Sequence, residues 1–148
     1  MTTHFMWDKF LYYAGAIRCI EATTASVSPG TISLLTQLLP QYDPILFPSL
    51  RYLSWTETFP ESNDLFYMLS PMLEELQLGF YDFYDSVSTT FMFSEWAARL
   101  FHAASHLCPN IRFLTTGGIG PVVSSSAAIN YFDSLHRFTI TQRAFDCK

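Results

Sequence analysis

Two histidines and a cysteine come closest to a metal-binding pattern in this sequence. His102 and His106 are four residues apart, and Cys108 follows two residues later. Side chains at i and i+4 share one face of a helix, so the two imidazoles could contact one ion. Structural zinc needs four closely placed ligands, and no second cysteine or carboxylate cluster completes the set nearby. We therefore expect no metal site, with both histidines beside the outer face of a helix and Cys108 at the following turn.

A glycine-rich segment, TTGGIGP at 115–121, follows an expected strand and raises the question of nucleotide binding. A P-loop requires a lysine followed by serine or threonine after its glycines, but a Pro-Val pair occupies that region. The dinucleotide fingerprint requires a third glycine where Val123 stands. We expect a turn instead, in which Gly117 and Gly118 take positive φ as the strand ends. A loop at this position could still contact a partner.

Four carboxylates are close enough in sequence to suggest acid–base catalysis: Glu74, Glu75, Asp82 and Asp85. The glutamates lie between apolar positions of an expected strand and should face solvent, whereas the aspartates lie in the aromatic stretch GFYDFYDS. No catalytic pattern places a histidine or serine with them, and the chain contains no G-x-S-x-G, H-E-x-x-H or reactive-cysteine signature. We therefore predict that the chain is not an enzyme and uses no cofactor.

The composition is that of one folded domain, which we expect to span residues 1–148. Hydrophobic residues make up 49% and aromatic residues 17%, whereas charged residues make up only 14%. So few charges cannot cover a whole surface. Either aromatic side chains are exposed, or the chain is part of a larger assembly.

Charge and targeting signals narrow the classes of partner. The sequence contains eight Lys and Arg residues and 13 Asp and Glu residues, so its formal charge is -5. Because it also lacks a basic patch, we expect no nucleic-acid partner. No apolar run reaches the roughly 18 residues of a membrane span, and the N-terminus lacks a signal-peptide pattern, so we expect no membrane partner. The three cysteines, Cys19, Cys108 and Cys147, are too widely spaced for a disulfide framework. Reduced thiols are typical of the cytoplasm or nucleus.

A short apolar pattern, L-x-x-L-x-L, recurs along the chain. Its copies begin at positions 17, 50, 73, 111 and 135, with spacings of 33, 23, 38 and 24 residues. The apolar positions are Ile17, Ile20 and Ala22; Leu50, Leu53 and Trp55; Leu73, Leu76 and Leu78; Ile111, Leu114 and Thr116; and Leu135, Phe138 and Ile140. Periods in the twenties with this core are typical of leucine-rich repeats.

Each copy predicts a strand that cannot bury its apolar face alone. In L-x-L both apolar side chains point to one face, and the residue between them points to the other. Parallel stacking of such strands builds one continuous core. We therefore predict an α/β fold, a short irregular leucine-rich-repeat solenoid with parallel strands on one face and helices on the other.

Helices are expected between these strands. The first is expected at 31–39, with Thr31 as its N-cap and Pro40 ending it, and the second at 64–69, with Asp64 as its N-cap. The third is expected at 94–107, between the N-cap Ser94 and Pro109, and its apolar face comprises Trp96, Leu100, Ala103, Ala104 and Leu107. The fourth is expected at 125–132, with a serine as its N-cap. Pro48, Pro71 and Pro109 should each separate a helical or apolar segment from the next strand. The stretch 79–93 is expected to be a long aromatic connection, either covering the core or forming an interface.

The segments LFPSLRYLSW, LSPMLEELQLGFYD and LCPNIRFLTTGG resemble the leucine-rich-repeat region of fungal F-box-like proteins, particularly those of mushroom-forming fungi. WDKFLYYAGAIRCIEA resembles the start of that region, where an aromatic-rich helix precedes the first strand. The similarity covers roughly residues 7–141. It implies that the repeats bind a target protein while an F-box docks onto the adaptor of a cullin–RING ubiquitin ligase. No F-box is recognisable within residues 1–30, so we expect a fragment of a longer array, with the ligase contact depending on an upstream F-box.

The side chains that alternate with the buried apolar positions are the predicted contact surface for a protein partner. These are Arg51, Tyr52 and Ser54; Glu74, Glu75 and Gln77; Arg112, Phe113 and Thr115; and His136, Arg137 and Thr139. Two other interpretations remain open: a small α/β enzyme, which would need a polar pocket with several titratable groups at the strand ends, and a degenerate repeat fragment without a partner.

Overall fold

The computed structural model describes residues 2–23, 26–38, 45–57, 63–80, 87–117 and 130–141. Strands and helices alternate from α1 to β4, so the predicted α/β class is confirmed. The elements are α1 (Thr2–Ala16), β1 (Cys19–Thr23), α2 (Thr31–Gln37), β2 (Tyr52–Glu57), α3 (Asp64–Tyr67), β3 (Glu75–Phe80), α4 (Val87–Leu107), β4 (Phe113–Gly117) and β5 (Arg137–Thr141).

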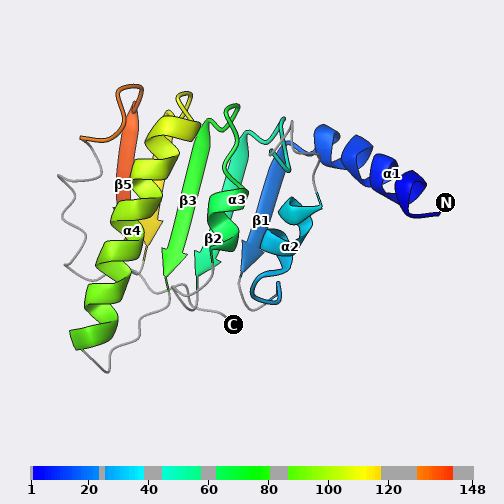
Figure 1. The fold of residues 1–148 in the computed structure, drawn as a ribbon. Coiled ribbons are helices and arrows are strands. Elements are labelled where there is room, and N and C mark those ends of the chain that lie inside the picture. The colour runs from blue at the N-terminus through cyan, green and yellow to red at the C-terminus, as the bar shows by residue number, and fades with distance from the viewer. Residues whose placement is uncertain are drawn as a thin grey trace, which may run out of the picture.

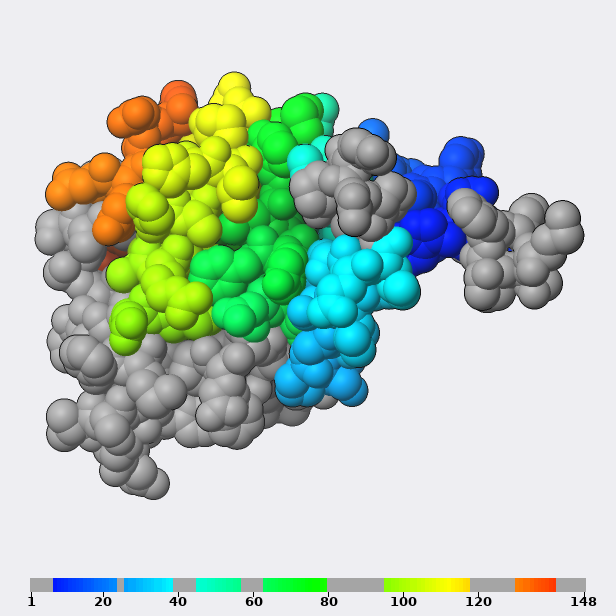
Figure 2. All heavy atoms as spheres, in the orientation of Figure 1, coloured from blue at the N-terminus to red at the C-terminus, as the bar shows by residue number. Residues whose placement is uncertain are grey.

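The five strands form one parallel sheet in which spatial order follows chain order, β1-β2-β3-β4-β5 (Figure 1). Every connection therefore moves one position in the same direction. Because parallel connections are almost always right-handed, such a path keeps its helices on one face of the sheet. α2, α3 and α4 lie side by side over that face (Figure 2). The opposite face carries no helix among the described elements.

The strand register aligns the predicted apolar positions in continuous rows. One row joins Ile20, Leu53, Leu76, Leu114 and Phe138 across all five strands, and the next joins Ala22, Trp55, Leu78, Thr116 and Ile140. Leu53, Leu76 and Leu114 are at most 1% exposed and belong to one core cluster. The prediction that these strands share one interior is confirmed.

Proline turns lead into three of the strands, as predicted. Pro48, Pro71 and Pro109 each occupy the second position of a hydrogen-bonded turn, where the fixed φ of proline is favourable. The closing bonds run from Leu50 N–H to Phe47 O (3.1 Å), from Leu73 to Ser70 (3.0 Å) and from Ile111 to Cys108 (3.3 Å). The second and third turns are also linked, because Asn110 Nδ2 donates to Pro71 O at 2.8 Å.

Adjacent strands are joined by the same backbone contact at each step. The carbonyl just before one strand accepts two N–H groups from the start of the next strand, at 2.8–3.1 Å. The accepting carbonyls belong to Arg18, Arg51, Glu74 and Arg112. This contact fixes the register at the N-terminal edge of the sheet, so the side chains at these positions also form a row.

The N-terminal ends of three helices differ from the prediction, and α2 and α3 end at Gln37 and Tyr67 rather than at residues 39 and 69. The N-cap of α2 is Gly30, with φ 80, so Thr31 is the first helical residue and not the cap. The N-cap of α3 is Asn63, not Asp64. α4 already begins at Val87, so Ser94 lies inside it, and residues 87–93 of the expected connection are helical. The β-branched residues at the start of α4 have low helix propensity, and the sequence pattern therefore concealed it.

The buried face of α4 agrees with the prediction except at its end. Trp96, Leu100 and Ala104 are at most 4% exposed, whereas Leu107 is 50% exposed. Gly117 ends β4 without the positive φ expected for it; Gly30 is the one described residue with positive φ. Outside the described residues lie Pro40, Gly118, 81–86 and most of the expected helix 125–132. The described residues 130–132 of that expected helix are not helical, and 130–131 form a turn.

α1 precedes β1, as the resemblance implied, and extends outward beyond that strand (Figure 1). Trp7, Phe10 and Leu11 pack against the core cluster, to which Ala14 belongs, and the four residues recur at helical spacing. The rings of Trp7 and Phe10 stack with centroids 5.1 Å apart. Tyr12, on the other side of the helix, is 76% exposed.

Asp64 joins two helices although it is only 2% exposed. Its carboxylate accepts the Gly30 N–H at 2.8 Å and the Ser33 N–H at 3.0 Å, both at the N-terminus of α2. These N–H groups have no acceptor within their own helix, and the positive end of the helix dipole favours an anion there. A side chain on α3 thus caps α2.

We predict that Asp64→Asn lowers the free energy of unfolding by about 1–3 kcal/mol, because the amide brings a donor to a site built from donors and removes the charge. Urea unfolding monitored by circular dichroism would measure this. The matched control, Asp8→Asn on the exposed side of α1, should change stability by less than about 0.5 kcal/mol. Equal effects of the two substitutions would contradict the capping role of Asp64.

Candidate functional site

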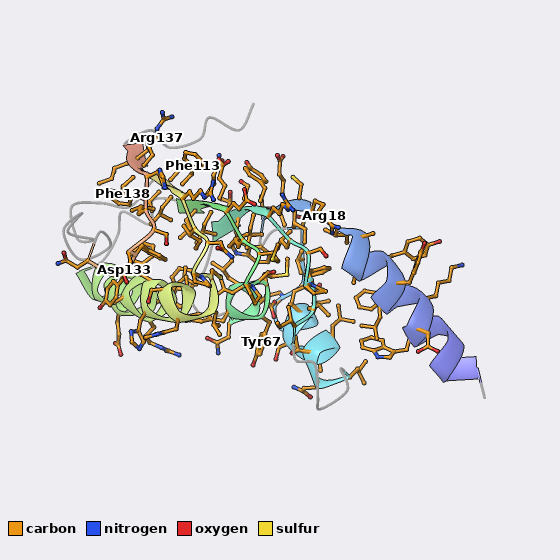
Figure 3. The ribbon with its side chains drawn as sticks, turned by 90° about the horizontal axis from the view of Figure 1, so that it is seen from above. Arg18, Tyr67, Phe113, Asp133, Arg137 and Phe138 are labelled. Atoms are coloured by element: carbon orange, nitrogen blue, oxygen red, sulfur yellow. The ribbon has the colours of Figure 1, made fainter. Side chains whose placement is uncertain are left out.

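The twelve predicted contact residues lie on the side of the sheet that carries no described helix and along the N-terminal edge of the strands, and we call this surface the strand face. Tyr52, Glu75, Phe113 and Arg137 are register partners on β2 to β5, and Ser54, Gln77 and Thr115 are partners one row further along. Arg51, Arg112 and His136 precede these strands at the shared-carbonyl positions. Phe113 and Arg137 project from the sheet on the side opposite Tyr67 and the helices (Figure 3).

The residues of the strand face differ in solvent exposure. Five residues are exposed: Arg51, Arg112, Phe113, His136 and Arg137. Five are half-buried: Tyr52, Ser54, Glu75, Gln77 and Thr115. Glu74 and Thr139, the two further positions predicted for this surface, are also half-buried. The structure thus brings all predicted contact residues to one surface, and their binding of a partner stays a prediction.

The charged edge carries one ion pair between neighbouring strands. Arg51 Nη1 lies 3.5 Å from Glu74 Oε1, and both side chains are substantially exposed, so the pair contributes little to stability. Glu75 Oε1 accepts a hydrogen bond from Gln77 Nε2 at 2.9 Å. Glu74 and Glu75, two of the four carboxylates considered for catalysis, therefore contact an arginine and an amide, respectively. The other two, Asp82 and Asp85, lie outside the described residues.

Tyr52 presents a neutral phenol at the centre of the strand face. Burial raises the pKa of Tyr52, and the carboxylates of Glu21 and Glu75 raise it further, while a hydrogen bond with Ser54 acts in the opposite direction. The hydroxyl therefore keeps its proton through neutral pH and can donate a hydrogen bond. An aromatic ring with a polar tip suits a protein interface.

A depression of about 330 Å³ lies near the C-terminal ends of β1–β3. Its lining includes Glu21, Ser54, Gln77 and Thr115 from one register row and Thr56 and Gly79 from the next. Glu21 is the one titratable side chain among the described lining residues. These groups can hydrogen-bond to a peptide, but a lone carboxylate provides no acid–base pair.

Sequence analysis missed part of this depression. Glu21, Thr56 and Gly79 were not predicted as contact residues, because the β1 copy of the pattern is weak and the outward positions were followed for too few residues. Continuing the alternation past Ala22 and Trp55 would have placed Thr23 and Thr56 on the same face. The signal was therefore present in the sequence.

The histidine pair is on α4, away from the strand face. Both rings are exposed, with centroids 4.6 Å apart, and Tyr131 lies 6.0 Å from His102. Cys108 is 1% exposed, at the turn after α4, and hydrogen-bonds with the Ser70 backbone. The described part of the chain contains no group of three His, Cys, Asp or Glu that could hold a metal ion.

No family model, curated protein or solved structure matches the chain. Its resemblance to F-box-like repeat regions therefore stays an expectation from the sequence. Among the described helices, none is sufficiently long and apolar to cross a membrane.

We predict that Cys108 resists alkylation in the folded protein. Burial raises the pKa of its thiol to about 12, and the thiolate is the reactive form. Iodoacetamide near neutral pH should modify the exposed Cys19 quickly and Cys108 only after unfolding, as peptide mapping would show. Urea-unfolded protein is the control, in which both should react.

The same shift gives a stability prediction with a defined sign. Since the pKa of Cys108 is higher in the folded chain, the contribution of this thiol to the free energy of unfolding is complete below its ordinary pKa of 9.0. That contribution declines as the pH rises toward about 12.

The alkylation test has a contradicting outcome of its own. If folded Cys108 is alkylated as fast as Cys19, the thiol is not buried.

Proposed function

We propose that this chain is a protein-interaction module, built as a short leucine-rich-repeat solenoid that contacts its partner through the strand face. The solenoid interpretation is supported by the sequential parallel strand order, with helices on one side. It is also supported by the recurring proline turns and by the carbonyls that join each strand to the next. In such arrays each repeat packs mainly on its neighbours, leaving an extended surface for binding.

The exposed outward rows are the observation that carries the proposal. Leu53, Leu76 and Leu114 fill the core, so the intervening side chains are not required to bury it. Among those, Tyr52 and Phe113 present aromatic rings beside several arginines. Tyrosine, phenylalanine and arginine are enriched in protein interfaces. A solvent-facing sheet surface of this composition is therefore suited to a protein partner.

The cellular role proposed for the module is target recognition within an F-box-like ubiquitin-ligase adaptor. The support is the sequence resemblance, whose segments form the turns and strands from β2 to β4. Contact with the cullin–RING ligase adaptor would require an F-box outside residues 1–30. The cytoplasm or nucleus is the proposed location, and the free state of Cys19 and Cys108 agrees with a reducing compartment.

The alternative of a small α/β enzyme has one feature in its favour. Ligands of open α/β sheets bind at the carboxyl ends of the strands, which is where the depression lies. Catalysis there would need several titratable groups, but Glu21 is the single one among the described lining residues. Binding is therefore favoured over catalysis. The other alternative, a degenerate fragment, predicts that the chain fails to unfold cooperatively.

We predict that Tyr52→Ala/Arg112→Ala weakens binding of a protein partner by about tenfold or more, since tyrosine and arginine are typical interface hot spots. Partners captured with the intact chain would be purified, and their affinity measured by biolayer interferometry. The matched control, Tyr12→Ala/Arg99→Ala, removes the same residue types from α1 and α4. Unchanged affinity of the strand-face variant would show that the contact surface lies elsewhere.

The ligase role has its own test. Tagging the gene at its native locus and purifying the product should recover a cullin adaptor together with the target protein. Recovery of a strand-face target without the adaptor would preserve the interaction module and overturn the ligase assignment.

A further inference from the structure

Two neighbouring arginines at the β5 end of the strand face have no hydrogen-bond or ion-pair partner among the residues that the structure describes. The other described arginines are engaged: Arg18 Nη1 donates to Gly15 O at 3.0 Å, Arg51 pairs with Glu74, and Arg99 lies over the Phe66 ring at 5.8 Å. Arg112 and Arg137 are exposed, and neither guanidinium has a hydrogen bond or ion pair among the described residues. Among the described arginines, the two without a partner are therefore neighbours.

The backbone holds these arginines close together. The Arg112 carbonyl accepts the N–H groups of His136 at 2.8 Å and Arg137 at 3.0 Å. Phe113, the residue after Arg112, is the register partner of Arg137 and is 39% exposed. We call Arg112, Phe113, His136 and Arg137 the cationic corner. It combines two guanidinium groups and an open aromatic ring within two adjacent strands, which lie about 4.8 Å apart.

The nearest carboxylates on the strand face do not neutralise the corner. Glu75 is the register partner of Phe113, but it accepts a hydrogen bond from Gln77, and Glu74 pairs with Arg51. Asp133 lies beside α4 on the helix side, away from Arg137 (Figure 3). Because Glu74 is paired with Arg51, the two guanidinium groups outnumber the one remaining neighbouring carboxylate, that of Glu75, and the described residues of the corner keep a net positive charge in a chain of formal charge -5. A partner carboxylate could form charge-assisted, bidentate hydrogen bonds there.

We propose that the cationic corner binds an acidic segment of the partner protein, with carboxylates on Arg112 and Arg137 and an apolar side chain against Phe113. This inference rests on the proposed function, because it assigns partner chemistry to the same face. A peptide fits better than a nucleic acid. Nucleic-acid surfaces need an extended basic stripe, whereas this pair of arginines is bounded by Glu74 and Glu75 on the β3 side.

The test uses an unbiased library of short linear peptides displayed on phage and selected against the intact folded chain. Selected sequences should be enriched in Asp and Glu beside an aromatic or aliphatic residue. Fluorescence anisotropy with the synthesised peptides should show about tenfold or greater weakening in Arg112→Glu/Arg137→Glu. Added salt should weaken binding to the intact chain.

Two matched variants exclude trivial explanations. Lys9→Glu/Arg99→Glu makes the same change in net charge away from the strand face and should leave affinity unchanged. Arg112→Lys/Arg137→Lys keeps the charge and should retain most of the binding. Circular dichroism would establish that each variant is folded, and if the charge reversal unfolds the chain, Arg112→Gln/Arg137→Gln replaces it.

Three outcomes would overturn the inference. In the first, the selected peptides are not enriched in acidic residues, yet they bind the Tyr52→Ala variant more weakly than the intact chain. This result would keep the strand face as the contact surface and refute the acidic partner. In the second, the selected peptides bind every strand-face variant with the affinity that they have for the intact chain, and this result would refute both proposals. Single-stranded DNA that binds more tightly than any selected peptide, and loses affinity in Arg112→Glu/Arg137→Glu, would assign the corner to nucleic acid.

Discussion

Burial of aliphatic side chains across adjacent parallel strands is the constraint on which the rest of the structure depends. A five- or six-residue strand cannot shield its own leucines, but the register joins Leu53, Leu76 and Leu114 into one row. Each fully buried leucine contributes about 1.5–3 kcal/mol relative to an exposed one. This gain requires neighbours on both sides of a strand. Order in the sheet therefore follows order in the chain, and the helices cover the face that these leucines form.

The same constraint separates stability from recognition. Because successive side chains of a strand point to opposite faces, residues between the leucines contribute little to the core. Tyr52, Phe113 and the arginines can therefore serve binding without loss of packing. Asp64 shows the contrasting case of a polar group that is buried because the fold requires it. Its carboxylate satisfies N–H groups of another helix, so this polar contact belongs to the scaffold.

The sequence was most informative where structure depends on local alternation. The five copies of the apolar pattern predicted every register pair of the two core rows, and the prolines predicted the turns before β2, β3 and β4. It was least informative where tertiary contacts decide. The cap of α2 comes from Asp64, which is distant in sequence, and α4 begins in β-branched residues that its packed face stabilises.

The candidate site followed the same division. Alternation predicted which strand residues face outward, including Arg137, whereas Arg112 precedes its strand at the N-terminal edge of the sheet. It could not show that Arg51 finds a carboxylate on the neighbouring strand whereas those two arginines find none among the described residues. Pairing across strands depends on side-chain reach and on which residues the neighbouring strand carries. The depression beside Glu21 likewise arises from four strands together, so no single copy of the pattern indicates it.

The most direct test is an NMR measurement of nuclear Overhauser contacts between backbone protons of adjacent strands. The account predicts contacts of a parallel ladder that pair Leu53 with Leu76 and Leu76 with Leu114, with Tyr52 and Phe113 side chains on the face opposite Leu100. Antiparallel contacts, a register displaced by one residue, or helical contacts through Tyr52–Glu57 would contradict it. A displacement of one residue would be enough, because it would exchange the buried and exposed faces.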